Sequence, residues 1–416
     1  MGHITHSKLA SGLDLLVEPM VGVRSAAITI SVPAGLVSEP ADRLGAAGVM
    51  SEVLMRGAGE LDSRAAADAF DRAGCTRHVD AGSRGMVLRG VTIGDAIGGA
   101  IGLFAKMLLG PSLTDDAVAP SKLLARQALD SLEDDPRERA SIAARARHLP
   151  PPFNRSALGD RAGIEALTTD DLRAWWAATA LPGGTIIGVA GDVDAERVVD
   201  AVSEALDGWA GDWEEPSPVG AAPRGVDHIE DDSNQVQILT MHEAPIEADE
   251  PASIREKLAA SVLSGGMSGR LFTEVREKRG LCYAVSAGYR GDDRFGSLSA
   301  YVGTTPERAQ ESLDVLNSEL RRIRTPEGAV TEAEFERART GMRANVVFHG
   351  ESTSARSGAL VSDFRKVGRG RTLDEMTALI DSVTLGSLNE YLVSTPLGGA
   401  TLQTLGPSSL EAPPGF

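Results

Sequence analysis

The sequence has little of what stabilises small secreted proteins or binds nucleic acid. Only two of its 416 residues are cysteine, which excludes a disulfide scaffold and a cysteine-rich metal site. Lys and Arg number 41 against 59 Asp and Glu, giving a net charge of −18. Because binding to nucleic-acid phosphates or to an anionic membrane needs clustered cations, this balance argues against both partners.

Long apolar runs are also missing. No window approaches the roughly 18 uninterrupted apolar residues of a membrane-spanning helix. The first 19 residues have no apolar run after a basic start, so they do not predict a secretory signal. We therefore expect a soluble, cytoplasmic protein with reduced thiols.

Several catalytic motifs are absent. The sequence contains neither of the phosphate loops G-x-x-x-x-G-K-[ST] and G-x-G-x-x-G, and it has no G-x-S-x-G nucleophile elbow. None of the seven histidines belongs to an H-x-x-x-H or H-x-x-E-H motif. Nucleotide binding, serine hydrolysis and a helical zinc site therefore have no support from local motifs.

The order of elements indicates a duplicated unit. The stretch 211–233 is rich in Pro, Gly and acidic residues without helical or strand periodicity, which predicts a linker between domains 1–210 and 234–416. The predicted strands include 26–33, 185–193, 235–241 and 398–405, and the predicted helices include 43–56, 63–72, 195–206, 254–263 and 328–350. The two halves share this order of elements, so we predict a duplicated α+β unit.

The segment 264–304 is the most informative part of the chain. SGGMSG at 264–269 predicts a flexible turn. The next ten residues predict a short amphipathic helix that ends at Gly280. Two alternating runs, 281–289 and 295–303, then predict a hairpin.

Residues 264–283, SGGMSGRLFTEVREKRGLCY, closely resemble the C-terminal signature of the pitrilysin/insulinase-type zinc peptidases. The resemblance is to the short bacterial members, which are similar to the mitochondrial processing peptidase. Weaker matches extend it over nearly the whole chain, at 8–17, 45–57, 168–176 and 189–194. The resemblance implies the α+β fold of that family: two homologous α/β sandwich-like domains, each a mixed, largely antiparallel sheet covered by helices.

The resemblance also implies a zinc site, with H-x-x-E-H on the helix at 45–57 and a further Glu about 75 residues later. This sequence has Gly48, Ser51 and Glu52 at the motif positions and Gln127 near the last one. No histidine lies between residues 7 and 77, so no shift of register restores the ligands. Because one carboxylate does not hold zinc, we expect no metal in this chain and none of the autonomous activity.

A second part of the family's site is retained. The resemblance implies an Arg and a Tyr seven residues apart that reach a zinc site in another domain or subunit, and Arg276 and Tyr283 match them. A tyrosine hydroxyl and a guanidinium can stabilise the oxyanion formed when a peptide carbonyl is attacked. From spacing alone, an arginine serving a helix end and a half-buried strand tyrosine are the simpler explanation of the pair, whereas the surrounding match favours the functional one.

The turn before this pair occupies the place of a glycine-rich loop in the non-catalytic subunit of the mitochondrial processing peptidase, where the loop is implicated in substrate handling. The matching residues, and our substrate-binding candidates, are Gly265, Gly266, Met267, Ser268 and Gly269. Its short length leaves a simple flexible turn as the alternative.

These features predict a zinc-free subunit of a heterodimeric pitrilysin-type metallopeptidase. The partner, a zinc-binding paralogue or a second copy of this chain, would carry the zinc and hydrolyse unfolded peptides bound by strand addition to a sheet edge. One alternative is a structural or peptide-binding protein without a catalytic role. Another is a peptidase with a relocated metal site at His242, Glu243 and His349.

Overall fold

The computed structural model describes residues 3–414 and 416 and divides into two compact units. Within those residues, unit 1 covers the chain up to Ser131 together with Pro151–Val219 and His349–Thr372. Unit 2 comprises Leu132–Pro150, Gly220–Phe348 and Leu373–Phe416. Each unit therefore includes a segment from the other half of the chain, and neither follows a continuous stretch of sequence.

Unit 1 is built on a six-stranded mixed sheet. In spatial order its strands are β1 (Thr5–Lys8), β2 (Asp14–Pro19), β8 (Ile186–Gly191), β3 (Ser25–Val32), β7 (Met86–Ile93) and β6 (His78–Ala81). Only the pair of β2 and β8 is parallel; the other neighbours are antiparallel. A short ribbon pairs β4 (Gly57–Ala58) with β5 (Leu61–Asp62).

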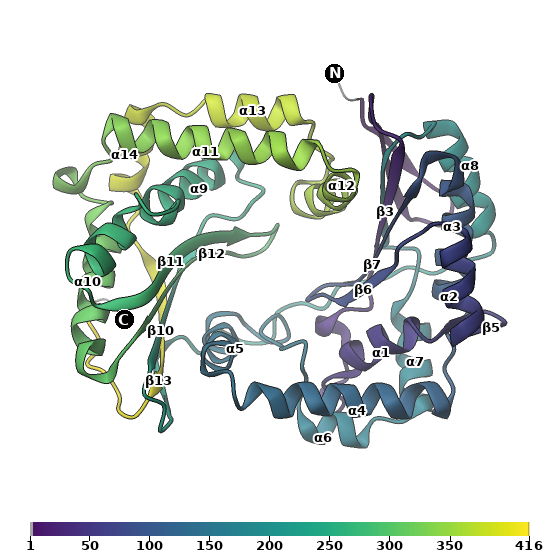
Figure 1. The fold of residues 1–416 in the computed structure, drawn as a ribbon, viewed down its shortest axis with the longest axis horizontal. Coiled ribbons are helices and arrows are strands. Elements are labelled where there is room, and N and C mark those ends of the chain that lie inside the picture. Colours follow the sequence, from purple (N-terminus) through teal and green to yellow (C-terminus); the bar gives the residue numbers. More distant parts are fainter. Residues whose placement is uncertain (1–2, 415) are drawn as a thin grey trace. The chain divides into compact units, whose positions relative to one another are not determined.

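Helices cover both faces of this sheet. The helices of unit 1 are α1 (Ala46–Leu54), α2 (Ser63–Arg72), α3 (Ile97–Leu109), α4 (Asp115–Leu132), α6 (Arg161–Ala166), α7 (Thr169–Thr179), α8 (Ala195–Ala205) and α12 (Thr353–Val367), with 3-10 turns at Leu36–Ser38 and Gly94–Ala96. The main core joins β2, β3 and β7 to α1, α3 and α8, and it encloses Met50 and Phe104. Helices α2, α3 and α8 lie along one face of the sheet, and α12 lies on the other (Figure 1). On the opposite face, Leu360 and Val361 of α12 pack against Leu16.

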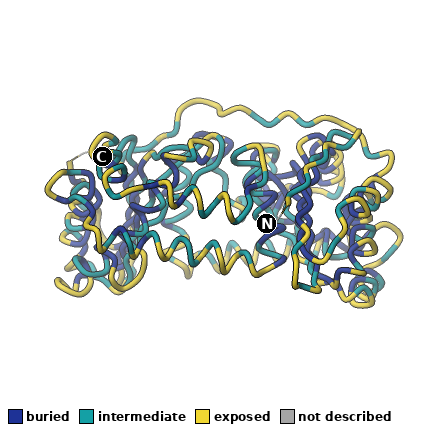
Figure 2. Tube along the Cα trace, turned by 90° about the horizontal axis from the view of Figure 1, so that it is seen from above, coloured by how far each residue is buried: buried dark blue, intermediate teal, exposed yellow. Residues whose placement is uncertain are grey.

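Unit 2 is built on a five-stranded mixed sheet. Its spatial order is β11 (Cys282–Gly291), β12 (Gly296–Thr304), β10 (Val236–Ala244), β13 (Gly398–Gly406) and β9 (Gly225–Glu230), with only β13 and β9 parallel. Its helices are α5 (Pro136–His148), α9 (Glu250–Ser264), α10 (Ala309–Arg322), α11 (Glu332–Gly350), α13 (Leu373–Asp381) and α14 (Leu385–Ser394), with a π-helix at Phe272–Glu277 and 3-10 turns at Pro306–Arg308 and Pro326–Gly328. In both units the buried residues lie along the sheets and the inner faces of the helices (Figure 2).

Five of the six strands of unit 1, all but β1, correspond to the five strands of unit 2. The order β2-β8-β3-β7-β6 in unit 1 matches β9-β13-β10-β12-β11 in unit 2, and the single parallel pair falls in the same place. The predicted α+β fold with mixed, largely antiparallel sheets covered by helices is thus confirmed. In each unit the last strand, β6 or β11, has a neighbour on one side only.

The units exchange equivalent helices. Helix α5, from the first half of the chain, packs on β10 and β13, while α12, from the second half, packs on β3 and β8. Arg356 of α12 forms a fully buried ion pair with Glu18 of β2, with its Nε 2.8 Å from Glu18 Oε2. Two hydroxyl contacts, Ser25–Thr353 at 3.1 Å and Thr29–Ser357 at 2.9 Å, join the same surfaces.

Most predicted elements are confirmed, with two corrections. The stretch 211–233, expected to contain no strand, includes β9, whose residues 225–230 pair in parallel with β13 at the edge of the sheet. All six residues are half-buried or exposed, so this edge strand lacks the alternating apolar pattern by which a strand is recognised in the sequence. The segment 270–279 forms mainly a π-helix instead of an α-helix. The division into two domains at this linker stays a prediction. Among the described residues, no helix combines the length and the apolar content that crossing a bilayer requires.

Candidate functional site

Arg276 lies in the π-helix Phe272–Glu277, directly before the edge strand β11. The backbone bond from Lys278 N to Thr273 O, at 3.0 Å, spans five residues and widens the turn. Such π-turns are rare and occur frequently at functional sites. The Arg276 side chain is exposed, and its guanidinium carbon lies 5.0 Å from the centre of the Phe272 ring.

Among the cations of this segment, Arg276 alone lacks a carboxylate partner in the described chain. Arg270 binds Glu334, while Lys278 and Arg279 both bind Glu274 at 2.7 and 2.9 Å. These bonds lower the pKa of the Glu274 carboxyl and keep it ionised. The signature therefore fixes three of its cations in ion pairs and leaves the fourth available to a ligand.

Tyr283 also lacks a partner in the part of the chain that the structure describes, unlike the other three tyrosines, whose hydroxyls are all hydrogen-bonded. The hydroxyls of Tyr289, Tyr301 and Tyr391 donate to Pro245 O, Gln237 Oε1 and Glu256 Oε1, respectively. Tyr283 is 59% exposed, and its hydroxyl has no partner among the described residues. Tyr283 is therefore not the half-buried strand residue that the simpler explanation of the pair requires.

A β-bulge places Tyr283 on the edge strand. The pairing of β11 with β12 shifts register between Cys282, opposite Thr304, and Ala284, opposite Gly303. Bulges of this kind redirect a side chain and recur beside active sites. Burial raises the pKa of the Cys282 thiol and the charge of Arg276 lowers it, so the guanidinium lies near the start of β11.

The predicted substrate loop forms the turn that joins α9 to this segment. Gly265 N donates to Ser261 O at 2.6 Å, and Gly269 N donates to Gly266 O at 3.0 Å. Met267 is 73% exposed at the tip of the turn. Gly266 has φ 113°, a left-handed conformation that favours glycine.

Sequence reasoning missed the residue that anchors this loop. Arg270 is buried and forms two parallel hydrogen bonds with Glu334 of α11, Nε–Oε1 at 2.7 Å and Nη2–Oε2 at 2.8 Å. Its Nη1 also donates to Gly328 O at 2.7 Å. Burial raises the pKa of Glu334, but the bonds from Arg270 and Thr331 outweigh it and lower the pKa to about 2. The loop end and the π-helix are thus held to α11.

The residues at the zinc-motif positions do not fit a metal. Glu52 of α1 and Gln127 of α4 are exposed, and the Ser51 hydroxyl donates back to Gly48 O at 2.7 Å. A Cβ atom on Gly48 would lie 2.8 Å from Ala157 O, so the first ligand position is closed by the backbone. Between residues 3 and 414, and at 416, no three His, Cys, Asp or Glu side chains group closely enough to hold a metal ion.

The alternative metal site has only two of its three residues, His242 and Glu243, in unit 2. They are consecutive residues of β10, at an irregularity in its pairing with β13, and Glu243 is already bound by Arg224. His242 is buried, and burial lowers its pKa to about 4.

Comparisons with known proteins agree with the fold. Residues 166–342 match the family model described as the peptidase M16 inactive domain. The chain is 26% identical to an uncharacterized zinc protease of Streptomyces coelicolor, over 92% of this chain and 85% of that protein. It is 21% identical to another in Bacillus subtilis, covering 91% and 92%.

Two solved structures share the fold over almost the whole chain. A peptidase M16 inactive domain from Pseudomonas fluorescens superposes with a TM-score of 0.84 at 21% identity, covering 99% of both chains. A protease from Helicobacter pylori gives a TM-score of 0.85 at 16% identity, covering 97% of this chain and 100% of that one.

Proposed function

Because this chain is a member of the pitrilysin-type peptidase M16 family, we propose that it acts as the zinc-free subunit of a two-chain peptidase. It supplies Arg276 and Tyr283 to a zinc site carried by a partner, either a paralogue or a second copy. The observation that carries this proposal is the pair itself. Arg276 is the cation of its segment without a carboxylate partner, and Tyr283 is the tyrosine whose hydroxyl has no partner among the described residues. Arg276 lies in the π-helix and Tyr283 at the β-bulge, both beside the edge strand β11.

The chemistry assigned to the pair is hydrogen-bond donation. When a peptide carbonyl is attacked, negative charge develops on its oxygen, and the Tyr283 hydroxyl and the Arg276 guanidinium both donate to it. Neither side chain has to break an existing ion pair or hydrogen bond to do so. The zinc and the activated water belong to the partner in this proposal, because the positions of this chain that match the motif offer a single carboxylate.

The substrate class is an extended peptide. Strand β11 is ten residues long and lies at the edge of its sheet, with Tyr283 at its start. Along its length it carries no proline and only one charged residue, Arg290, whereas edge strands that avoid pairing usually carry several such features. A peptide added to this edge gains main-chain hydrogen bonds without sequence-specific contacts, which suits unfolded substrates.

We place the complex in the cytoplasm. Both cysteines, Cys75 and Cys282, are free thiols, which agrees with a reducing compartment.

The test begins with purification of the tagged protein from its native cells and identification of any stoichiometric companion. For the complex we expect Arg276→Ala and Tyr283→Phe each to lower kcat on the order of 10²-fold. Matched controls are Arg279→Ala, in the same segment, and Tyr289→Phe, on the same strand, which should leave kcat within about threefold because neither side chain is free to reach a substrate.

Equal kcat values for Arg276→Ala, Tyr283→Phe and the unmodified complex would contradict the proposal. That result, or recovery of the protein without a zinc-binding companion, would favour the structural or peptide-binding alternative.

A further inference from the structure

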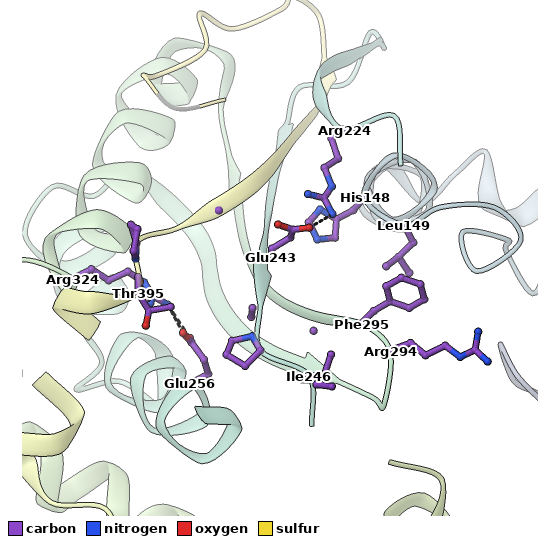
Figure 3. A pocket seen from close by; sticks show the side chains of 15 residues that line it. His148, Leu149, Arg224, Glu243, Ile246, Glu256, Arg294, Phe295, Arg324 and Thr395 are labelled. Carbon is purple, nitrogen blue, oxygen red and sulfur yellow. Dashed lines mark hydrogen bonds and ion pairs between the residues drawn. The ribbon is translucent and has the colours of Figure 1, made fainter. Parts of the chain in front are cut away.

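Unit 2 contains a cavity that the proposed function does not use. Its volume is about 370 Å³, within the range of roughly 300–1,000 Å³ typical of small-molecule sites. The walls come from the C-terminal end of α5, the end of β10, helix α9, the turn between β11 and β12, the start of β13, and the residues that precede β9 and follow α10 and α14 (Figure 3). Segments distant in sequence thus converge on one space at one end of the sheet.

One wall is an ion pair between Arg224 and Glu243. The Nη2 atom of Arg224 donates to Glu243 Oε1, and this bond lowers the pKa of Glu243, which is therefore ionised (Figure 3). The other terminal nitrogen, Nη1, and the other carboxylate oxygen, Oε2, have no partner among the described residues. A donor and an acceptor of opposite charge are thus left side by side at the cavity wall.

The backbone holds Arg224 in an unusual conformation to make this pair. Its φ is 43°, and no other non-glycine residue of the described chain has a positive φ. Arg147 of α5 fixes it by two hydrogen bonds, from Arg224 N to Arg147 O at 2.8 Å and from Arg147 Nη2 to Arg224 O at 2.7 Å. A Cβ atom on Gly399 would lie 1.8 Å from Arg224 Nη1, so the guanidinium occupies the space of an absent side chain. Strain of this kind persists where the surrounding structure determines it, often at ligand sites.

His148 adds a polar group without a charge. Burial, followed by the nearby Arg224, lowers its pKa to about 4, so the ring is neutral at neutral pH. Its Nδ1 lies 3.1 Å from Thr401 Oγ1, and its Nε2 has no partner among the described residues. The ring lies beside Glu243 and Arg224 (Figure 3).

The second ion pair of the cavity joins Arg324 to Glu256 and offers no net charge. Arg324 Nη2 donates to both oxygens of Glu256 at 2.7 and 2.8 Å, and Nη1 donates to Thr395 O at 2.7 Å. Apart from Arg294, the remaining lining is largely apolar and consists of Leu149, Ala244, Pro245, Ile246, Phe295, Gly296, Pro396 and Gly398. The cavity therefore combines one open pair of opposite charges with an apolar surface.

We propose that this cavity binds a free α-amino acid with an apolar side chain. The carboxylate is bound by Nη1 of Arg224 and the ammonium by Oε2 of Glu243, while the side chain packs against the apolar lining. The ammonium and the carboxylate of an α-amino acid are attached to the same carbon atom and therefore lie close together. They match the unpaired carboxylate oxygen and the unpaired guanidinium nitrogen of a single ion pair, which also lie close together. The neutral His148 ring accepts from the ammonium without repelling it. The inference stands on unit 2 alone and does not depend on the proposed peptidase role.

The test is calorimetric titration of the full-length protein with L-leucine at pH 7.5. We expect saturable binding, and at least tenfold weaker binding of three analogues: N-acetyl-L-leucine, which has no ammonium; L-leucinamide, which has no carboxylate; and glycine, which has no apolar side chain. The dipeptide leucylglycine separates the two charges and should also bind at least tenfold more weakly.

The variant Glu243→Gln should lower the affinity for L-leucine at least tenfold, with Glu230→Gln, an exposed glutamate of β9, as the matched control. The side chain of Glu243 is 54% exposed, so this exchange is compatible with folding, which the urea midpoint of the variant checks. Absence of saturation up to about 10 mM L-leucine overturns the proposal. So does an equal affinity of N-acetyl-L-leucine, or an unchanged affinity in Glu243→Gln. Arg276→Ala should leave L-leucine binding unchanged, which separates this test from that of the peptidase role.

Discussion

Gly48 of α1 lies so close to Ala157 that a Cβ atom on the glycine would approach the Ala157 carbonyl oxygen to 2.8 Å. Real Cβ atoms essentially never show so short a contact with backbone, so any side chain at residue 48 requires the chain at 157 to move. The loss of zinc ligands in unit 1 is therefore more than a substitution of three side chains. The neighbouring backbone has closed over the position that a first histidine would need.

Restoring the zinc motif by substitution should fail for this reason. We expect the triple variant Gly48→His, Ser51→Glu, Glu52→His, made in a Gln127→Glu background that supplies the last ligand of the motif, to bind no stoichiometric zinc and to lose roughly 1–3 kcal/mol of stability relative to that background through overpacking. Metal analysis of the purified variant and its urea unfolding curve measure both effects. The double variant Ser51→Glu, Glu52→His is the control and should keep nearly the original stability, since Glu52 is exposed and Ser51 only half-buried. One bound zinc per triple-variant chain would refute the closed-site interpretation.

The buried Arg270–Glu334 ion pair should contribute far more to the free energy of unfolding than the exposed Lys278–Glu274 pair. Removing one partner from a buried, doubly hydrogen-bonded pair leaves an uncompensated charge, so we expect Arg270→Ala to cost about 3 kcal/mol in the free energy of unfolding. Lys278→Ala, which breaks an exposed pair with Glu274, should cost about 0.5 kcal/mol or less. Urea denaturation compares the two, and equal costs would show that Arg270 does not anchor the loop.

The same pair gives a pH dependence with a definite sign. The folded pKa of Glu334, about 2, lies below the usual value of about 4.3, so the unfolded chain binds the proton more readily. Its contribution to stability is present above about pH 4.3 and is lost as the pH falls towards 2. Glu334→Gln should therefore be less stable than the unmodified chain at pH 6, and this difference should shrink at pH 3. A difference that is the same at both pH values would contradict this assignment.

His242 should make the folded chain sensitive to mild acid. Burial, then the charge of Arg321, lowers its pKa from 6.5 to about 4, so between these values the unfolded chain binds a proton that the folded chain does not. Stability therefore falls as the pH drops from 6.5 to 4, by on the order of 3 kcal/mol for this group. The variant His242→Leu lacks this titrating group. As the pH is lowered from 7 to 4.5, the free energy of unfolding of the variant should therefore rise by about 2 kcal/mol relative to that of the unmodified chain. Parallel pH profiles of the two proteins would contradict the shift.

The exchanged helices predict that the halves of the chain depend on each other. A fragment ending at residue 219 lacks α12, which leaves Glu18 without Arg356 and the apolar residues of that sheet face without cover. We expect this fragment alone to aggregate, and to become soluble when residues 220–416 are co-expressed. As a control, the complete chain cut after residue 219 once folded should elute as one species in size-exclusion chromatography. Independent folding of fragment 1–219 would refute this dependence.

The sequence predicts the local elements well because their signals are local. Helix α2 falls at 63–72 as predicted, since Asp62 caps its first turn and apolar residues recur at helical spacing. The hairpin predicted at 281–289 and 295–303 forms at 282–291 and 296–304, because alternation fixes which residues face the core.

What the sequence does not predict is set by distant contacts. Apolar residues on α5 and α12 show that one side of each helix is buried, but not which sheet covers it. The π-helix depends on hydrogen bonds that shift by a single residue, which leaves the apolar pattern almost unchanged. Arg224 lies in a stretch whose composition indicates a linker, so its place in a cavity becomes visible only when α5 and β13 are folded around it.

The exchange of α5 and α12 also sets the order of events during synthesis. Unit 1 needs residues up to 372, so its sheet keeps one uncovered face until nearly nine-tenths of the 416 residues have been polymerised. Domains made of continuous sequence can finish folding one after another as they leave the ribosome. Here the N-terminal sheet is covered only by a helix translated more than 300 residues later. Both units therefore reach their native state together, when translation of the chain is nearly complete.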